Sequence, residues 1–462
     1  MNKNKIKYQF SIKSESELEK LSHDELLNYI KNLQKNIVQE KPPKNSNNSS
    51  IPSSTEIVNP KPKKNQSLRE KSNKKVGAQL GRVGVTLLQS DTPNETIKLD
   101  YTISHCKKCA LDISNVIVSL KEKRQVLDIA LSSIKTEITE YQSFSKKCPQ
   151  CGTNNHDNSF ATNVTPNISY GATITAMVSY LSVAQYMSNK RIVSLLSNLF
   201  NIRLSEGSIS KLLAKASRLS QSEIEKITTL LSKASIVGID ETGCKVNGEK
   251  HWHWTFQDAR NTLVVADKSR GTKVITETFE NGFVNACVVH DNYSSYSTLE
   301  CQSEQLCLAH KLRDLNYAIE CDNTKLMKGI KLLLKEAIRD DKEKLTPKQR
   351  VKLKTQYERS LDHLLSMPTI AKSETYKQVK SLTKSKNKIF TFLLDPNIPP
   401  DNNASERAIR NVKVKQKVSG QFKSLDGAKN YATLRSIIDT SRKRGFNEFE
   451  SLVSIMQGNS LF

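Results

Sequence analysis

Three acidic residues, far apart in the sequence, are the candidates for chemistry. Asp240 and Asp291 each end an apolar, strand-like run, and Glu406 lies at the start of a predicted helix rich in arginine and lysine. Carboxylates on neighbouring elements bind hard divalent cations through oxygen. Two such cations activate the attacking oxygen and stabilise the leaving oxygen in phosphoryl transfer. The three acids therefore predict a metal site that acts on a polyanion.

Each acid also has an ordinary structural interpretation. Asp240 fits a strand-end turn, and Asp291 with Asn292 fits an Asx turn. Glu406 fits the third position of a capping box that begins at Asn403. The metal interpretation requires that the strands before Asp240 and Asp291 lie side by side.

The elements around these acids follow an α/β pattern. Residues 311–395 are highly charged with leucines at helical spacing, and a final helix pair follows them. The pattern predicts an α/β core with an inserted helical domain. Five segments have strand-like patterns, of which the second alternates and is predicted to be half-buried: 234–240, 252–256, 262–266, 285–291 and 304–308.

Two Cys-x-x-Cys pairs predict a structural zinc site. Two residues between thiolates allow both sulfurs to bind one tetrahedral Zn²⁺, and two such pairs complete a Cys₄ site. A redox dithiol is the alternative. The four candidate zinc ligands are Cys106, Cys109, Cys148 and Cys151.

Composition favours a polyanionic partner. The chain has 462 residues and a formal net charge of +24, which favours a polyanionic partner and argues against a small enzyme with an acidic site. A merely lysine-rich surface is the alternative. No apolar stretch follows the lysines of residues 1–13, and the uncharged stretch 159–189 is too polar for a membrane span. With nine cysteines and no signal peptide, we expect a cytoplasmic protein with reduced thiols or metal-bound cysteines.

The chain is predicted to contain several domains. At the N-terminus, Ser22 and Glu25 fit a capping box, and an apolar 4-3-4 repeat suits either a short coiled coil or packing on the body. The predicted parts are a helical segment at 1–38, a disordered basic linker at 39–75, a zinc-binding DNA-binding module at 76–158, a helical segment at 159–232, a catalytic domain at 233–445 with a helical insertion at about 314–395, and a C-terminal tail at 446–462.

The helical segment contains a pattern similar to a helix-turn-helix. Residues 191–196 and 208–213 flank a turn at Ser205–Gly207, which would place Ser208, Ser210 and Lys211 near a DNA groove. A helical hairpin that supports the next domain fits equally well.

Several motifs occur together in the order seen in one family. They are Ile239-Asp-Glu-Thr-Gly243, Val289-His-Asp291, Cys307-Leu-Ala-His-Lys-Leu-Arg-Asp-Leu315 and Asp401-Asn-Asn-Ala-Ser-Glu-Arg407. Together with the paired cysteines, the Asn- and Ser-rich linker and the segment Val412–Gly420, they resemble the large transposase of the sixty-six family of bacterial insertion sequences. The resemblance covers nearly the whole chain.

The resemblance implies an RNase-H-like, mixed-sheet catalytic core with a DDE triad of Asp240, Asp291 and Glu406. Such enzymes cut DNA at the ends of the element with water, and the freed 3′ hydroxyl then attacks target DNA. Two Mg²⁺ or Mn²⁺ ions per active site serve both steps. Cys307 and His310 match the family's Cys-x-x-His element and are expected to shape the site beside the second acid. The implied partners are element ends, target DNA and further copies of this chain on DNA, and a need for accessory proteins of the element stays open.

A basic edge is predicted after the third acid. Lysines alternate there with valines, so one edge would be basic and the other apolar, and we assign the basic edge to the DNA backbone. The residues assigned to DNA are Arg407, Arg410, Lys413, Lys415 and Lys417.

One segment departs from the family pattern. Residues 77–82 read Gly-Ala-Gln-Leu-Gly-Arg, where the family usually has Gly-Gln-Pro-Gly-His. Without that proline and histidine, no specific DNA contact is carried over to this segment. Two alternatives to a transposase remain at this stage: a metal-dependent nuclease of the same fold, and a zinc-stabilised DNA-binding protein without catalysis.

Overall fold

The computed structural model describes nearly all of the C-terminal two thirds of the chain and separate stretches before it. The described residues are 6–8, 15–39, 42, 44, 48, 89–93, 95–97, 104–117, 120, 124–125, 136–142, 144–156 and 169–462 without 297. Most of the predicted linker at 39–75 and much of the predicted module at 76–158 lie outside them. Within the described residues, no helix combines the length and the apolar character that a membrane span needs.

A five-stranded mixed sheet forms the centre of the molecule. Its order is β7-β6-β5-β8-β9, with β5, β6 and β7 antiparallel and β8 and β9 added in parallel with β5. The Asn247-Gly248 turn joins β5 to β6, and both of its residues have the positive φ that a tight hairpin requires. The strands are β5 (Ile236–Val246), β6 (Glu249–Gln257), β7 (Thr262–Asp267), β8 (Phe283–His290) and β9 (Cys301–Leu306).

All five predicted strands are therefore present, but two details of the prediction are wrong. Asp240 does not end its strand, because β5 continues to Val246 as one arm of the hairpin with β6. The second strand is not half-buried: His253 and Thr255 are as fully buried as Trp254 on the opposite face. Side chains cover both faces of the sheet, so alternation of residue types in β6 does not mean alternation of exposure.

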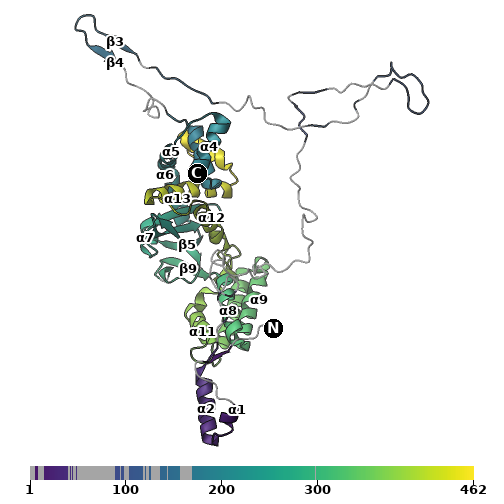
Figure 1. Cartoon of the computed structure of the whole chain (residues 1–462), viewed down its shortest axis with the longest axis vertical. Coiled ribbons are helices and arrows are strands. Elements are labelled where there is room, and N and C mark those ends of the chain that lie inside the picture. Colours follow the sequence, from purple (N-terminus) through teal and green to yellow (C-terminus); the bar gives the residue numbers. More distant parts are fainter. Residues whose placement is uncertain are drawn as a thin grey trace.

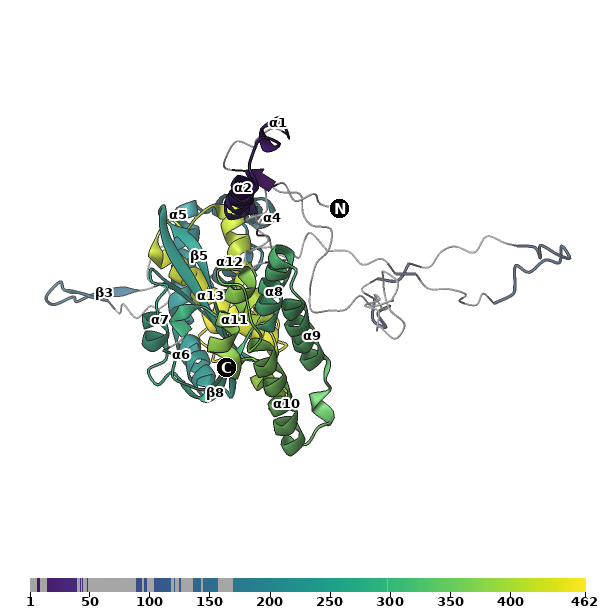
Figure 2. The ribbon, with the colours of Figure 1, turned by 90° about the horizontal axis from the view of Figure 1, so that it is seen from below.

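Helices are arranged at both ends of the sheet (Figure 1). At one end lie α3 (Ala172–Ser179), the π-helix η3 (Tyr180–Ala184), α4 (Asn189–Phe200), α5 (Glu206–Leu219) and α6 (Gln221–Ser232). At the other end lie α8 (Leu308–Asp322), α9 (Lys325–Arg339), α10 (Pro347–Leu365) and α11 (Glu374–Ser385). Figure 2 shows α8, α9 and α10 side by side. The short helix α7 (Lys273–Thr278) connects β7 to β8.

The last three helices return to the sheet. They are α12 (Asn403–Ser419), α13 (Leu425–Lys443) and α14 (Glu448–Met456). The predicted C-terminal tail is thus partly helical, and Leu452 and Ile455 of α14 are buried. Apolar contact with α3 and α13 orders this segment, which its short sequence did not reveal.

Side chains from α13 cover one edge strand of the sheet. The hydroxyls of Ser436 and Thr440 accept hydrogen bonds from the backbone amides of Val264 (2.8 Å) and Thr262 (3.0 Å) in β7. An uncovered edge would offer unpaired backbone groups to another chain. A buried ion pair between Arg435 and Asp439 holds α13 further, since Arg435 also reaches Val183 O in η3.

The pair of helices predicted as a helix-turn-helix is present as α4 and α5. Ser205 caps α5 by accepting a hydrogen bond from the amide of Ser208 at 3.0 Å. Ser210 and Lys211 are exposed on α5, while Ile209 and Leu212 are buried. Because α5 also packs against α3 and α13, the hairpin supports the core whether or not it contacts DNA.

The N-terminal segment is helical only in part. The predicted capping box is confirmed, because Ser22 N donates to Glu25 Oε2 (2.9 Å) and Glu25 N donates to Ser22 Oγ (3.4 Å). The helices α1 (Glu15–Leu18) and α2 (His23–Asn36) lie between two short paired strands, β1 (Ile6–Tyr8) and β2 (Ile37–Gln39). The coiled coil stays a prediction.

Burial of His253 predicts an acid-sensitive part of the fold's stability. Burial, and then the charges of Lys413 and His251, lower the pKa of this histidine from 6.5 to about 4. Between these pH values the unfolded chain binds a proton that the folded chain does not, so stability falls as the pH falls. We expect the loss to approach about 3 kcal/mol by pH 4, and His253→Leu to lack this component in urea unfolding curves taken from pH 7 to pH 4.

A matched change at the exposed His363 serves as control. His363→Leu should keep the pH dependence of the wild type. If His253→Leu and the wild type lose stability in parallel over this range, the histidine does not titrate as its burial implies.

Candidate active site

The first two acids lie side by side at the centre of the sheet. Strands β5 and β8 run parallel, and their last paired residues are Gly238 and Val289. Continued by two residues, this register places Asp240 opposite Asp291, which directly follows β8. The predicted adjacency of the two strands is confirmed.

A local hydrogen bond orients each of these carboxylates. Glu241 N donates to Asp240 Oδ1 at 2.9 Å, and Tyr293 N donates to Asp291 Oδ1 at 3.0 Å. The second bond is the Asx turn that the sequence allowed. One oxygen of each carboxylate is thus held by the backbone, and the other is left for a ligand.

A buried latch attaches the start of α12 to β5. Asn402 Nδ2 donates to Ile239 O at 2.6 Å, and Asn402 Oδ1 accepts from Ser405 Oγ at 2.6 Å. Gly238 permits this approach, because a β-carbon there would lie 2.5 Å from Ser405 Oγ and 3.1 Å from Asn402 Oδ1. The latch brings Glu406, one residue after Ser405, to the strand that carries Asp240.

The helix cap at this point differs from the predicted one. Asn402, not Asn403, is the N-cap residue of α12, and its side chain bonds to β5 instead of capping the helix. Glu406 is therefore not the third residue of a capping box. Its carboxylate is left free to contribute to the acid cluster.

The three predicted acids are close enough to interact electrostatically. Burial raises the pKa of Asp240 well above its usual range, and the negative charges of Asp291, Glu241 and Glu406 raise it further. Like charges that share a low-dielectric site disfavour ionisation of one another. The ionised form of Asp240 is therefore disfavoured in this site.

His310 and Cys307 lie beside the third acid. One potential ligand atom from each of Cys307, His310 and Glu406 falls within 4.8 Å of the other two. His310 Nε2 is 3.8 Å from Glu406 Oε1, and Cys307 Sγ accepts a hydrogen bond from Asn402 N at 3.2 Å. Burial raises the pKa of the Cys307 thiol to about 12.

The residues present fit a hard divalent cation. Within the described part of the chain, Glu406 Oε1 and His310 Nδ1 are buried without a hydrogen-bond partner. Carboxylate oxygens are the ligands that Mg²⁺ and Mn²⁺ prefer. A cation among Asp240, Asp291 and Glu406 would offset their repulsion and give the unpaired oxygen a partner.

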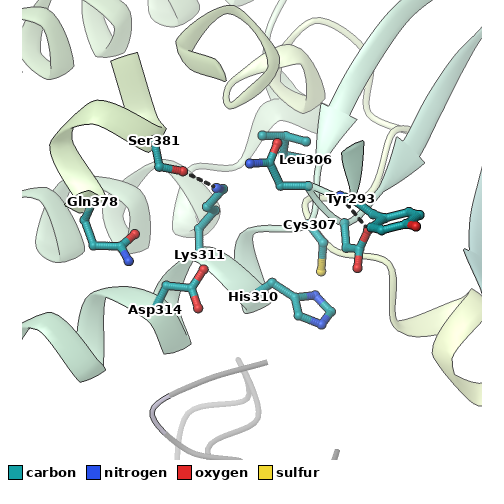
Figure 3. Close-up of a pocket in the computed structure, with 10 residues that line it drawn as sticks. Tyr293, Leu306, Cys307, His310, Lys311, Asp314, Gln378 and Ser381 are labelled. Carbon is teal, nitrogen blue, oxygen red and sulfur yellow. Dashed lines mark hydrogen bonds between the residues drawn. The ribbon is translucent and has the colours of Figure 1, made fainter. Parts of the chain in front are cut away.

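A cavity of about 270 Å³ adjoins this cluster. Its wall includes Asp291 as well as Gln378 and Ser381 of α11. Figure 3 shows His310 and Lys311 of α8 between Tyr293 on one side and Gln378 and Ser381 on the other. Lys311 is almost fully buried and donates to Ser381 Oγ at 3.3 Å. The helical insertion thus forms part of the surroundings of the second acid.

Comparison with protein families identifies the family of this chain. Residues 167–430 match the model of a family described as Transposase IS66 family, which is more than half of the chain. The chain belongs to this family. No curated protein matches the sequence. The part of this IS66-family transposase that matches contains Asp240, Asp291 and Glu406 but not the paired cysteines.

The prediction that alternating residues give this transposase a basic edge is wrong. The segment is the helix α12, so every third or fourth residue shares a face, and strict alternation has no meaning there. Lys415 is buried and donates to Ser182 O at 3.1 Å, and half-buried Lys413 donates to Gly243 O at 2.8 Å. Lys415 therefore supports the fold in this conformation and is not placed to contact DNA. The exposed cations of the helix are Arg407, Arg410 and Lys417.

Each cysteine pair forms a compact turn of its own. Cys106 N donates to Leu111 O (2.8 Å), and Cys148 N donates to Thr153 O (2.8 Å) at the strand pair β3 (Ser145–Lys147) and β4 (Asn154–His156). Nearby donors lower the pKa of Cys106 and, at the second turn, that of Cys151 to about 7. Among the described residues, the sulfurs of the two pairs are not gathered into one cluster. A shared zinc stays a prediction.

Sequence reasoning missed the residues that hold the acids. Asn402, Ser405 and Gly238 form the latch, and Arg270 binds Glu241. A signal for Gly238 was present, because a glycine inside an apolar strand often marks a close approach of another segment. Nothing local distinguishes Asn402 from Asn403.

The latch predicts a stability difference between two adjacent asparagines of the transposase. Asn402→Ala removes the donor to Ile239 O and the acceptor of Ser405, leaving buried groups unpaired. We expect this to cost about 1–3 kcal/mol, measured by urea unfolding. Asn403→Ala, which deletes the same amide one residue later, should cost clearly less, and equal losses would contradict the latch.

Proposed function

We propose that this IS66-family transposase cuts and joins DNA by metal-dependent phosphoryl transfer at Asp240, Asp291 and Glu406. The observation that carries the proposal is that the β5–β8 register places Asp240 opposite Asp291, while the Asn402 latch brings Glu406 to the same strand. Among the described residues the oxygens of the three acids do not all lie within 4.8 Å of one another, so a bound cation would have to draw them together. Such crowding of acids is unfavourable for the fold alone and suits a cation-binding role.

Each acid has a defined part in the proposed site. Asp240 and Asp291 each present one carboxylate oxygen beyond the one held by a backbone amide. Glu406 presents an oxygen that has no partner among the described residues. Bound Mg²⁺ would activate the attacking oxygen and stabilise the leaving oxygen.

His310 would keep Glu406 in place without serving as a base. Its Nε2 lies 3.8 Å from Glu406 Oε1, a distance at which a small movement would form a hydrogen bond. Cys307 supports the same helix start by accepting from Asn402 N. The Cys-x-x-His element would thus position the third acid.

Exposed cations beside the acids would bind the DNA backbone. Arg407 and Arg410 lie on the exposed face of α12 next to Glu406, and Lys417 lies further along the same helix. Contacts of this kind position DNA without reading its sequence. The net charge of +24 supports the same partner.

The sheet supports an RNase-H-like core. Three antiparallel strands followed by two parallel ones, with the first acid on the central strand β5 and the second after β8, agree with that arrangement. The helical insertion then lies between the second and third acids.

The central test is Asp291→Asn. Removing one ligand charge should abolish Mg²⁺- or Mn²⁺-dependent cleavage of a plasmid that carries the element ends, because the cations lose a shared ligand. Binding to the same DNA, measured by gel shift, should be kept or strengthened. Asp426→Asn, at an exposed position in the first turn of α13, is the matched control and should cleave like the wild type.

Equal cleavage by the wild type and Asp291→Asn would refute the proposed site. Cleavage of ends without joining of pre-cleaved ends to target DNA would point to a nuclease of the same fold.

The two cysteine turns predict one structural zinc per chain. Four thiolates complete a closed tetrahedral site and leave no position for substrate. Elemental analysis of the purified full chain should find about one zinc per chain. Cys148→Ser should lose it, whereas Cys301→Ser in β9 should not. Zinc-free protein with four reactive thiols in the two turns would exclude the site.

A further inference from the structure

Arg270, which follows β7, contacts the elements of both the first and the second acid. Its guanidinium donates two hydrogen bonds to Glu241 Oε1, from Nε at 3.0 Å and from Nη2 at 2.8 Å. Glu241 is the buried neighbour of Asp240 in β5. One side of Arg270 is thereby fixed to the strand of the first acid.

The flat face of the same guanidinium contacts the loop of the second acid. Its central carbon lies 3.7 Å from the ring centre of Tyr293 and 4.4 Å from that of Trp252 in β6. Cations at such distances from aromatic rings are attracted by the ring electrons. Tyr293 is also the residue whose amide orients Asp291.

Further hydrogen bonds tie the two loops together. Ser295 Oγ donates to Arg270 O at 3.1 Å, and Thr272 Oγ1 donates to Ser295 O at 2.9 Å. The Tyr296 hydroxyl donates to Glu241 as well. Arg270 is thus the centre of a set of contacts that spans the two acid-bearing elements.

Arg270 also supplies positive charge to the most crowded part of the site. Glu241 adds a fourth carboxylate next to the three proposed ligands, and its charge acts on Asp240. Pairing with Arg270 offsets that charge without placing a cation among the ligands themselves. A lysine would keep the charge but lose the two-pronged bond and the flat face.

We propose that Arg270 is a positioning residue that sets the spacing of Asp240 and Asp291 for cation binding, by joining Glu241 to Tyr293. The inference rests on the proposed function of the acids. In this proposal Arg270, a residue outside the DDE triad, controls how tightly the site binds metal.

The test measures metal binding directly by the full-length protein. Terbium(III) is a hard cation that oxygen ligands bind, and its emission is excited by nearby tryptophan, of which Trp252 and Trp254 lie in β6. The titration midpoint, not the brightness, reports affinity, and competition with Mg²⁺ confirms the site. Loss of such a supporting contact lowers metal affinity by about 10- to 100-fold, so Arg270→Lys should shift the midpoint at least about tenfold.

Three further variants make the result specific. Asp291→Asn shows which part of the terbium signal comes from binding at the acids. Arg260→Lys makes the same chemical change at an exposed arginine in the β6–β7 turn and should behave as wild type. Tyr293→Leu removes the ring but keeps the Glu241 pair, and it should also weaken binding. Melting temperatures of all four variants identify any that are simply unfolded.

The outcomes separate the inference from the proposed function. If Asp291→Asn loses the signal while Arg270→Lys and Tyr293→Leu bind as tightly as wild type, Arg270 does not position the acids, and the acid site stands. If Arg270→Lys reduces DNA binding but leaves the terbium midpoint unchanged, Arg270 is a DNA contact and the inference is wrong. A wild-type signal in Asp291→Asn would overturn both, since there would be no metal site to position.

Discussion

Mutual repulsion of carboxylates around Asp240 is the constraint on which the rest of the structure depends. The negative charges of Asp291, Glu241 and Glu406 all raise the pKa of Asp240. Glu241 is the next residue in the chain, whereas Asp291 and Glu406 come from other elements. In such a cluster a bound cation, or a proton on Asp240, relieves the repulsion, and contacts elsewhere in the fold hold the groups together. Some of these contacts hold neighbouring backbone, and others bind a carboxylate directly, as Arg270 binds Glu241.

The opposing interactions come from three directions. The parallel pairing of β5 with β8 fixes Asp240 and Asp291 in register. The Asn402 latch holds α12, and therefore Glu406, against Ile239 O. Along the same helix, buried Lys415 donates to Ser182 O in η3. The helices that precede the sheet are therefore also connected to the helix of the third acid. Cations near the acids thus divide into buried ones that anchor α12 and exposed ones that can meet DNA.

Much of the sheet could be predicted from the sequence, because apolar strands end or turn at recognisable residues. The run before Asp291 and the Asn247-Gly248 turn are local signals of this kind. The exposure of individual residues could not be predicted in the same way. The lysines of α12 illustrate the reason: whether Lys415 faces solvent depends on which elements pack around the helix, and those elements are more than 200 residues away in the sequence.

The predicted convergence of three acids depended on family resemblance more than on local pattern. From the residues alone, Glu406 fitted a helix cap as well as a ligand, and only the packing of α12 on β5 distinguishes the two. The residues that make this packing possible carry weak signals. Gly238 is one small residue in an apolar strand, and Asn402 is one of two adjacent asparagines.

The way in which the helical insertion joins the core explains how it can lie between two acids without separating them. Its ends meet at the sheet: Leu308 N donates to Pro400 O at 2.9 Å, and Asn402 N donates to Cys307 Sγ at 3.2 Å. Shortly before this point the chain covers the second edge strand, since Phe392 N donates to Gln305 Oε1 in β9. The positions of the acids are therefore set by the junction and not by the length of the insertion. The insertion therefore adds residues of α8 and α11 to the cavity beside Asp291 without setting the spacing of the acids.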